Sequence, residues 1–136
     1  MSWLGSFLRY QFPAVAWGAV IFAASSVPST KIPSLLLESY DKLIHGGIFF
    51  ILGILVYRAI RPLGASSTEP LHFNVGRMIV SVGIVILYGA TDEVHQAWVP
   101  GRSVDILDLT ADAVGGLLAA LVLYILARWR GRTASA

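Results

Sequence analysis

The feature that most constrains this chain is its set of long apolar segments. A helix needs about 20 mostly apolar residues to cross the hydrocarbon core of a bilayer. The 136 residues contain four segments near that length, roughly 12–27, 41–60, 78–97 and 105–129. Hydrophobic residues make up 56% of the sequence and charged residues only 13%, unlike a soluble domain. We therefore expect an all-α integral membrane protein, a single domain over 1–136 that folds as a four-helix bundle.

The first apolar segment allows two interpretations. Arg9 precedes an apolar run that ends in small residues, which resembles a cleavable signal peptide. Trp17 and Phe22 continue the run, and small residues are common in membrane helices. These residues favour a retained span, preceded by a short lead over 1–10 at the membrane interface.

The basic residues flank the apolar segments, so we interpret them as topology signals and expect no nucleic-acid partner. With four spans, both termini and the 58–77 loop share one side. That side carries Arg9, Arg58, Arg61, Arg77, Arg128, Arg130 and Arg132, against Lys31, Lys42 and Arg102 on the other. The positive-inside rule then places both termini in the cytoplasm. His72 in the 58–77 loop has no charged neighbour in sequence, and we expect it to be solvated.

The acidic residues have the opposite distribution, since all but Glu69 fall on the extracytoplasmic side with His45 and His95. Residues three or four apart share a helix face. This spacing aligns Asp41 with His45, Asp92 with His95 and Gln96, and Asp105 with Asp108 and Asp112. On the fourth helix the same face continues into Gly115, Gly116 and Ala119, where another helix can approach closely.

Two cations cannot neutralise the carboxylates of this region. Lys42 and Arg102 are the available counter-charges, against Asp41, Asp92, Glu93, Asp105, Asp108 and Asp112. Some of these acids must therefore be solvated, carry protons, or meet a cation or a cationic ligand. The candidate ligand-binding residues are Asp41, Lys42, His45, Asp92, Glu93, Gln96, Arg102, Asp105, Asp108 and Asp112.

Structural interpretations remain open for the same residues. Asp92, Glu93, Arg102 and Asp108 can form an ion network that fixes the hairpin between the third and fourth helices, with Pro100-Gly101 as its turn. Asp41 and Lys42 can be an interfacial cap and a snorkelling lysine. A divalent metal, zinc or a similar ion, requires the candidate ligands His45, His95, Asp92 and Asp108 to converge.

Two linked motifs carry a resemblance to a known family. The first is Asp41-Lys42-x-x-His45, and the second is Asp92-Glu93-x-His95-Gln96-x-x-x-Pro100-Gly101-Arg102-Ser103-x-Asp105-x-x-Asp108, followed by Ala-Asp-x-x-Gly. The sequence resembles the VanZ-like family of small bacterial membrane proteins over nearly its whole length. Asp112 departs from the Asn frequent in that family and adds a carboxylate. The resemblance implies a multi-pass protein of the bacterial cytoplasmic membrane; the founding member is associated with teicoplanin resistance, and no reaction is implied.

Three functions follow as hypotheses. In the first, the outer mouth of the bundle binds an amphiphile, a lipid-linked envelope precursor or a lipoglycopeptide, with Arg102 and Lys42 meeting phosphate or carboxylate, and so affects teicoplanin susceptibility. In the second, the protein is a membrane-embedded hydrolase or transferase, with or without a metal, that acts on a lipid or envelope precursor; its catalytic candidates are Asp92, Glu93, His95 and His45. Transport is a third, which would need an oligomer because the acids collect at one end. Membrane lipid is the expected partner in each case, and the sequence leaves the oligomeric state open.

Overall fold

The computed structural model describes residues 2–33, 40–60 and 74–133, and these residues are all-helical. Their elements are α1 (Trp3–Tyr10), α2 (Phe12–Ser25), the 3-10 helix η1 (Ser29–Lys31), α4 (Asp41–Ala59), α5 (Val75–Gln96) and α6 (Ile106–Thr133). The solvated histidine expected in the 58–77 loop, His72, lies outside the described residues, as do Glu38, Arg61 and Glu69.

Among the described residues, three helices are long and apolar enough to cross a membrane. They are α4, α5 and the Ile106–Arg130 part of α6, with mean hydropathies of 1.5, 1.4 and 2.0. Each agrees with an expected segment to within three residues at its start, and α6 continues beyond its expected end. The described part of the chain is therefore compatible with a multi-pass membrane protein.

The first apolar segment differs from the straight span expected over 12–27. Its helix α2 begins at Phe12 as expected but ends at Ser25, and its 14 residues rise only ~21 Å, less than a bilayer core of ~30 Å. It reaches membrane length only together with α1, from which it is bent by 43°. Pro13 explains the bend, because it lacks an N–H and its ring clashes with the carbonyl four residues earlier. A fourth crossing thus requires a broken helix.

Glycines on α6 bring it against α4 and α5. A Cβ on Gly115 would lie 2.3 Å from the Gly46 carbonyl oxygen of α4, and one on Gly116 would lie 2.8 Å from Val85 Cγ1 of α5. Ala119 packs against Gly53 of α4 in the same way. The close approach predicted for this small-residue face is confirmed.

The interior core is small, and most large apolar side chains point outward. Ile21, Phe49, Leu52, Val56 and Val85 form the buried cluster. Exposed apolar side chains run along every long helix, as in helices whose outer faces contact lipid.

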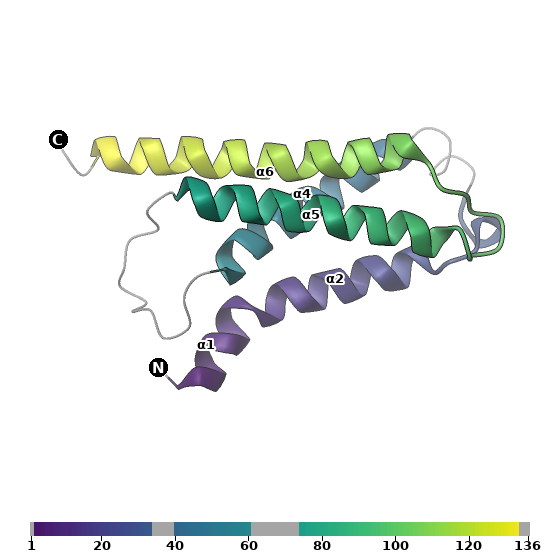
Figure 1. Cartoon of the computed structure of the whole chain (residues 1–136), viewed down its shortest axis with the longest axis horizontal. Helices are drawn as coiled ribbons and strands as arrows, with labels where there is room; N and C mark the ends of the chain where they lie inside the picture. The colour runs from purple at the N-terminus through teal and green to yellow at the C-terminus, as the bar shows by residue number, and fades with distance from the viewer. Residues whose placement is uncertain (1, 34–39, 61–73, 134–136) are drawn as a thin grey trace.

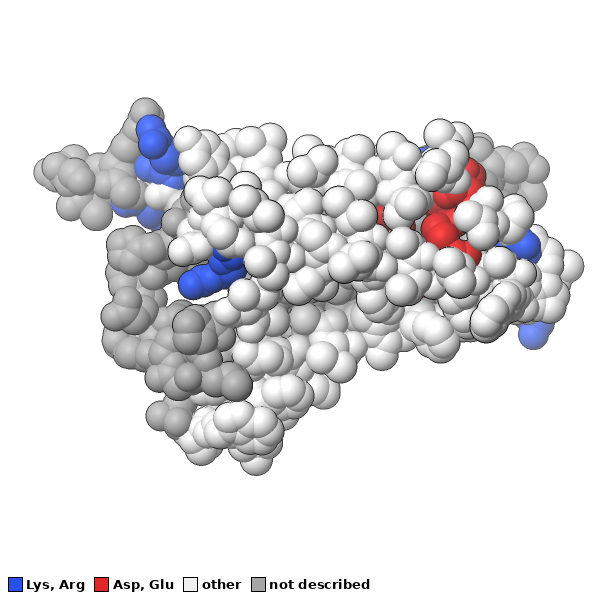
Figure 2. All heavy atoms as spheres, in the orientation of Figure 1, with Lys and Arg blue, Asp and Glu red and all other residues white. Residues whose placement is uncertain are grey.

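The helix ends that carry the polar motifs meet at one end of the molecule. Figure 1 shows the C-terminal ends of α2 and α5 beside the N-terminal ends of α4 and α6. Between α5 and α6 the chain turns at Gly101, whose φ of +75° suits glycine. A Cβ there would also meet Ser29 Oγ at 2.1 Å, so the turn packs directly on the segment after α2. On the face shown in Figure 2, the acidic atoms lie toward this end, whereas basic atoms lie toward both ends.

Candidate functional site

Lys42 organises the outer part of the site. Its ammonium group bonds Asp41 of its own helix at 3.2 Å, Asp105 at 2.6 Å, and Asp108 of α6. The side-chain hydrogen bond from Lys42, together with one from the Leu107 backbone N–H, lowers the pKa of the Asp105 carboxyl. One cation therefore holds three carboxylates and joins the start of α4 to the start of α6.

His45 lies one turn deeper along α4 and is buried. Its Nδ1 is 3.0 Å from Asp112 Oδ1, and its Nε2 faces Asp41 Oδ1 at 4.0 Å and Asp108 Oδ2 at 3.9 Å. Three carboxylates thus surround one imidazole, an arrangement that can hold a proton or, together with the carboxylates, a cation.

Asp92 and Glu93 are buried on α5 and bond neutral groups. Asp92 Oδ2 accepts hydrogen bonds from Ser25 Oγ at 2.8 Å and Gln96 Nε2 at 3.1 Å. Glu93 Oε2 accepts one from the Asp105 backbone N–H at 2.8 Å. The second carboxylate oxygen of each residue is buried without a hydrogen-bond partner.

Arg102 does not pair with the acids near it in sequence. Among the described residues it makes no ion pair, and its Nη1 donates a long hydrogen bond of 3.4 Å to Gln96 Oε1. Its Nε is buried without a partner. The ion network that the sequence suggested for Asp92, Glu93, Arg102 and Asp108 is therefore not formed in the described part of the chain.

His95 lies apart from His45. Its Nε2 is 3.0 Å from Ser26 Oγ, and its ring lies on Phe22 with centroids 4.3 Å apart. Two groups of potential metal ligands occur among the described residues: Asp41, His45 and Asp108; and His45, Glu93 and Asp112. Of the metal candidates expected from sequence, the structure brings His45 and Asp108 together and leaves His95 and Asp92 outside both groups.

Sequence reasoning missed the contribution of the first apolar segment. Ser25 bonds Asp92 and Ser26 bonds His95, so the last residue of α2 and its C-cap supply two hydroxyl partners to the site. The available signal was the adjacent pair of serines at the end of an apolar run. Gly89 was missed as well; a Cβ there would meet Asp112 Oδ2 at 2.8 Å, so its lack of a side chain makes room for Asp112.

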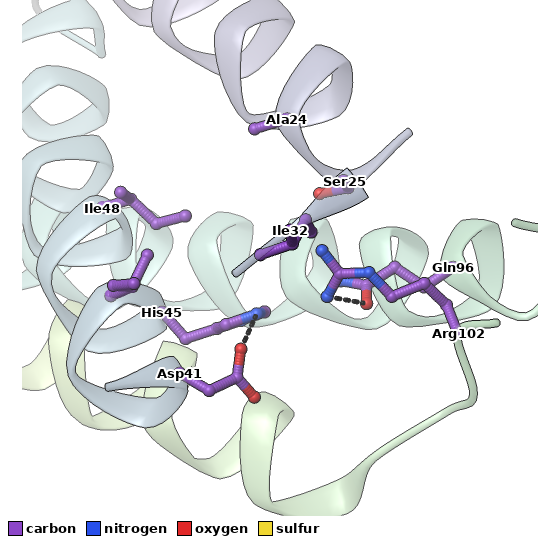
Figure 3. Close-up of a pocket in the computed structure, with 9 residues that line it drawn as sticks. Ala24, Ser25, Ile32, Asp41, His45, Ile48, Gln96 and Arg102 are labelled. Atoms are coloured by element: carbon purple, nitrogen blue, oxygen red, sulfur yellow. Dashed lines mark hydrogen bonds and ion pairs between the residues drawn. The ribbon is translucent and has the colours of Figure 1, made fainter. Parts of the chain in front are cut away.

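A cavity of about 170 Å³ opens between these groups. Figure 3 shows Asp41 and His45 extending from α4 toward Arg102 and Gln96 on the opposite side. The remaining lining residues are Ala24, Ser25, Ile32, Ile44 and Ile48. The cavity therefore has an apolar wall, one side that carries a carboxyl group and an imidazole, and an opposite side that carries a guanidinium group.

In the described residues, the three membrane-length helices and the polar cluster at one end are compatible with the class of small multi-pass membrane proteins. Within that class the chain belongs to the VanZ/LLP1 family, whose model matches residues 6–127. Searches among curated proteins and among solved structures gave no match. The family resemblance expected from the two motifs is thus confirmed.

Proposed function

We propose that this protein binds an amphiphile with an anionic head group, of the kind found in lipid-linked precursors of the cell envelope. The observation that carries the proposal is the position of Arg102. Its guanidinium lines the cavity and has no carboxylate partner among the described residues. A guanidinium is suited to planar, bidentate contact with phosphate or carboxylate.

A second cavity suits the apolar part of such a ligand. It measures about 330 Å³ and is lined mainly by apolar groups, including Gly18 and Ala19 of α2 and Leu52 and Val56 of α4. Ile44 and Ile48 of the polar cavity precede Leu52 and Val56 at four-residue spacing on α4. The two cavities therefore follow each other along the α2 and α4 pair, as an amphiphile requires.

The orientation of the site is part of the proposal. Arg9, Arg58, Arg77, Arg128 and Arg130 belong to the helix ends opposite the acid cluster. By the positive-inside rule these ends face the cytoplasm of a bacterial inner membrane, and the cavity opens to the outer face. A protein that holds an envelope precursor there would alter access of lipoglycopeptides such as teicoplanin. Expression in a susceptible strain should then raise the inhibitory concentration of teicoplanin, and Arg102→Gln should abolish the increase.

Direct binding tests the proposal. Farnesyl phosphate is titrated into the purified full-length protein in detergent micelles, with farnesol as the uncharged probe of equal length. We expect binding of farnesyl phosphate, a loss of about tenfold or more for Arg102→Gln, and a smaller loss for Arg102→Lys because lysine keeps only the charge. Arg128→Gln, at the other end of α6, is the control and should bind like the parent protein. Equal affinity for farnesol, or no effect of Arg102→Gln, would contradict the proposal.

A second candidate is a membrane-embedded hydrolase or transferase that acts on such a ligand. It is favoured by Asp41 and His45, which line the same cavity as Arg102 with Oδ1 and Nε2 4.0 Å apart. An imidazole and a carboxylate beside a bound phosphate can exchange protons with it. Release of inorganic phosphate from farnesyl phosphate, lost in His45→Gln, would support this function; binding without release supports the binding function alone.

A further inference from the structure

Three buried carboxylates behind the cavity share an unusual pattern. Asp92, Glu93 and Asp112 are only 4%, 2% and 0% exposed. In each, one oxygen is hydrogen-bonded and the other is buried without any hydrogen-bond partner. Buried polar atoms are normally paired, and an unpaired carboxylate oxygen is among the most costly exceptions.

The nearby basic side chains do not neutralise these acids. Lys42 is engaged by Asp41, Asp105 and Asp108, the outer carboxylates. Arg102 bonds Gln96 and makes no ion pair among the described residues. The imidazole of His45 is the one titratable nitrogen that the described structure places against this inner set, through Asp112.

We propose that a divalent transition-metal cation binds His45, Glu93 and Asp112. These residues come from α4, α5 and α6, and one donor atom from each lies within 4.8 Å of the other two. Shifts of about an ångström would bring them to the ~2.0–2.2 Å at which zinc holds imidazole nitrogen and carboxylate oxygen. The nitrogen donor favours a transition metal such as zinc over calcium or magnesium, which prefer oxygen alone.

Oxygens without a hydrogen-bond partner distinguish the group of His45, Glu93 and Asp112 from the group of Asp41, His45 and Asp108. Glu93 Oε1 and Asp112 Oδ2 lack partners, whereas Asp41 and Asp108 already bond the ammonium group of Lys42. The charge of Lys42 would also repel a second cation placed between those two acids. The inner group therefore has both the free donors and the unbalanced charge.

The metal site would join the three long helices at one point and stabilise them against separation. It stands independently of the binding proposed above, because it is detected without any amphiphile. If the protein binds metal but not farnesyl phosphate, the metal site is supported and the proposed function is contradicted. If it binds farnesyl phosphate but not metal, the proposed function is supported and the metal site is contradicted.

The test uses the full chain without a histidine tag, purified in detergent, stripped with a chelator and dialysed. Zinc and manganese are then titrated separately, and bound metal per protein is measured by mass spectrometry together with the melting temperature. We expect about one bound ion per chain and a higher melting temperature. Glu93→Gln and Asp112→Asn should each weaken binding more than about tenfold, since even groups that only orient a ligand cost that much.

Asp105→Asn is the matched control, because it removes one carboxylate of the same cluster but leaves the inner group intact. It should bind zinc like the parent protein. Glu93→Gln keeps the shape of the side chain and removes a charge that forms no ion pair among the described residues, so we expect a folded, metal-free protein at least as stable as the stripped parent. Asp112→Asn also weakens the pair with His45 and should cost some stability. The proposal would be overturned if the parent protein bound neither metal. It would also be overturned if metal bound the parent protein no better than Glu93→Gln. Loss of binding in Asp41→Asn but not in Glu93→Gln would place the ion in the outer group and would also overturn it.

Discussion

Ser25 Oγ lies 2.8 Å from Asp92 Oδ2 and ties α2 to α5 within the buried part of the site. Ser25 also donates, in the alternative rotation of its hydroxyl, to the Ile21 carbonyl oxygen at 3.0 Å. The buried hydroxyl thus helps to hold the C-terminal end of α2 against α5. Asp92 would keep only Gln96 as a partner without it.

Ser25→Ala should therefore lower the stability of the protein in detergent by about 1–3 kcal/mol, the usual cost of leaving a buried polar group without its hydrogen-bond partner. Ser26→Ala is the control. Its hydroxyl is exposed and bonds the Phe22 carbonyl oxygen and His95, so its loss should cost less. Chemical denaturation followed by circular dichroism measures both. Equal effects of the two substitutions would contradict the role given to Ser25.

Gly115 should tolerate no side chain. A Cβ would lie 2.3 Å from the Gly46 carbonyl oxygen and 2.9 Å from the Phe50 backbone nitrogen, and backbone atoms cannot move aside cheaply. Gly115→Ala should destabilise the protein by about 1–3 kcal/mol, as expected for overpacking. Gly83→Ala is the comparison, because no atom lies within 4 Å of its added Cβ. It should be neutral or slightly stabilising, since alanine favours the helix more than glycine does.

The Lys42 pair with Asp105 should make stability depend on pH. The carboxyl has a pKa below its unfolded value, chiefly through the hydrogen bond from Lys42. Its contribution is therefore fully present above the unfolded pKa, ~3.9, and is lost as the pH falls through the lower folded pKa. Asp105→Asn keeps an oxygen that can accept from the Leu107 N–H and removes the charge.

The difference in melting temperature between the parent protein and Asp105→Asn should thus be constant from pH 7 to about pH 5 and shrink below about pH 4. A difference that widens on acidification would show that Asp105 is not stabilised as an anion by Lys42.

Much of the fold was predictable because helices impose strong constraints on sequence. The apolar segments, the short turn at Gly101 and the small-residue face at Gly115 all follow from spacing, length and size. The shared location of the polar motifs also follows, because the C-terminal end of one membrane-spanning helix and the N-terminal end of the next lie on the same side of the membrane. The break between α1 and α2 was less evident, because a proline near the start of a helix usually fits there without a bend.

The pairing within the site was less predictable. Helical spacing shows which residues share a face of one helix, but contacts between helices depend on their crossing angles and on side-chain rotamers. Asp92 and His95 share a face of α5, and they bond Ser25 at the end of α2 and Ser26 just after it. Serines within an apolar run carry no charge pattern that marks them as partners. Arg102 was expected among the acids, but it bonds Gln96.

The proposed site requires the start of α4 and the segment after α5 to lie on the same, external face of the membrane. The sequence contains no cysteine, so single-cysteine variants can be labelled in intact cells with a membrane-impermeant maleimide. The exposed residues Tyr40 and Ser103 lie at the site end and exposed Trp129 near the opposite end of α6. We predict that Tyr40→Cys and Ser103→Cys are labelled in intact cells, and that Trp129→Cys is labelled only after permeabilisation. Labelling that places Tyr40 and Ser103 on different sides, or both inside the cell, would contradict the account.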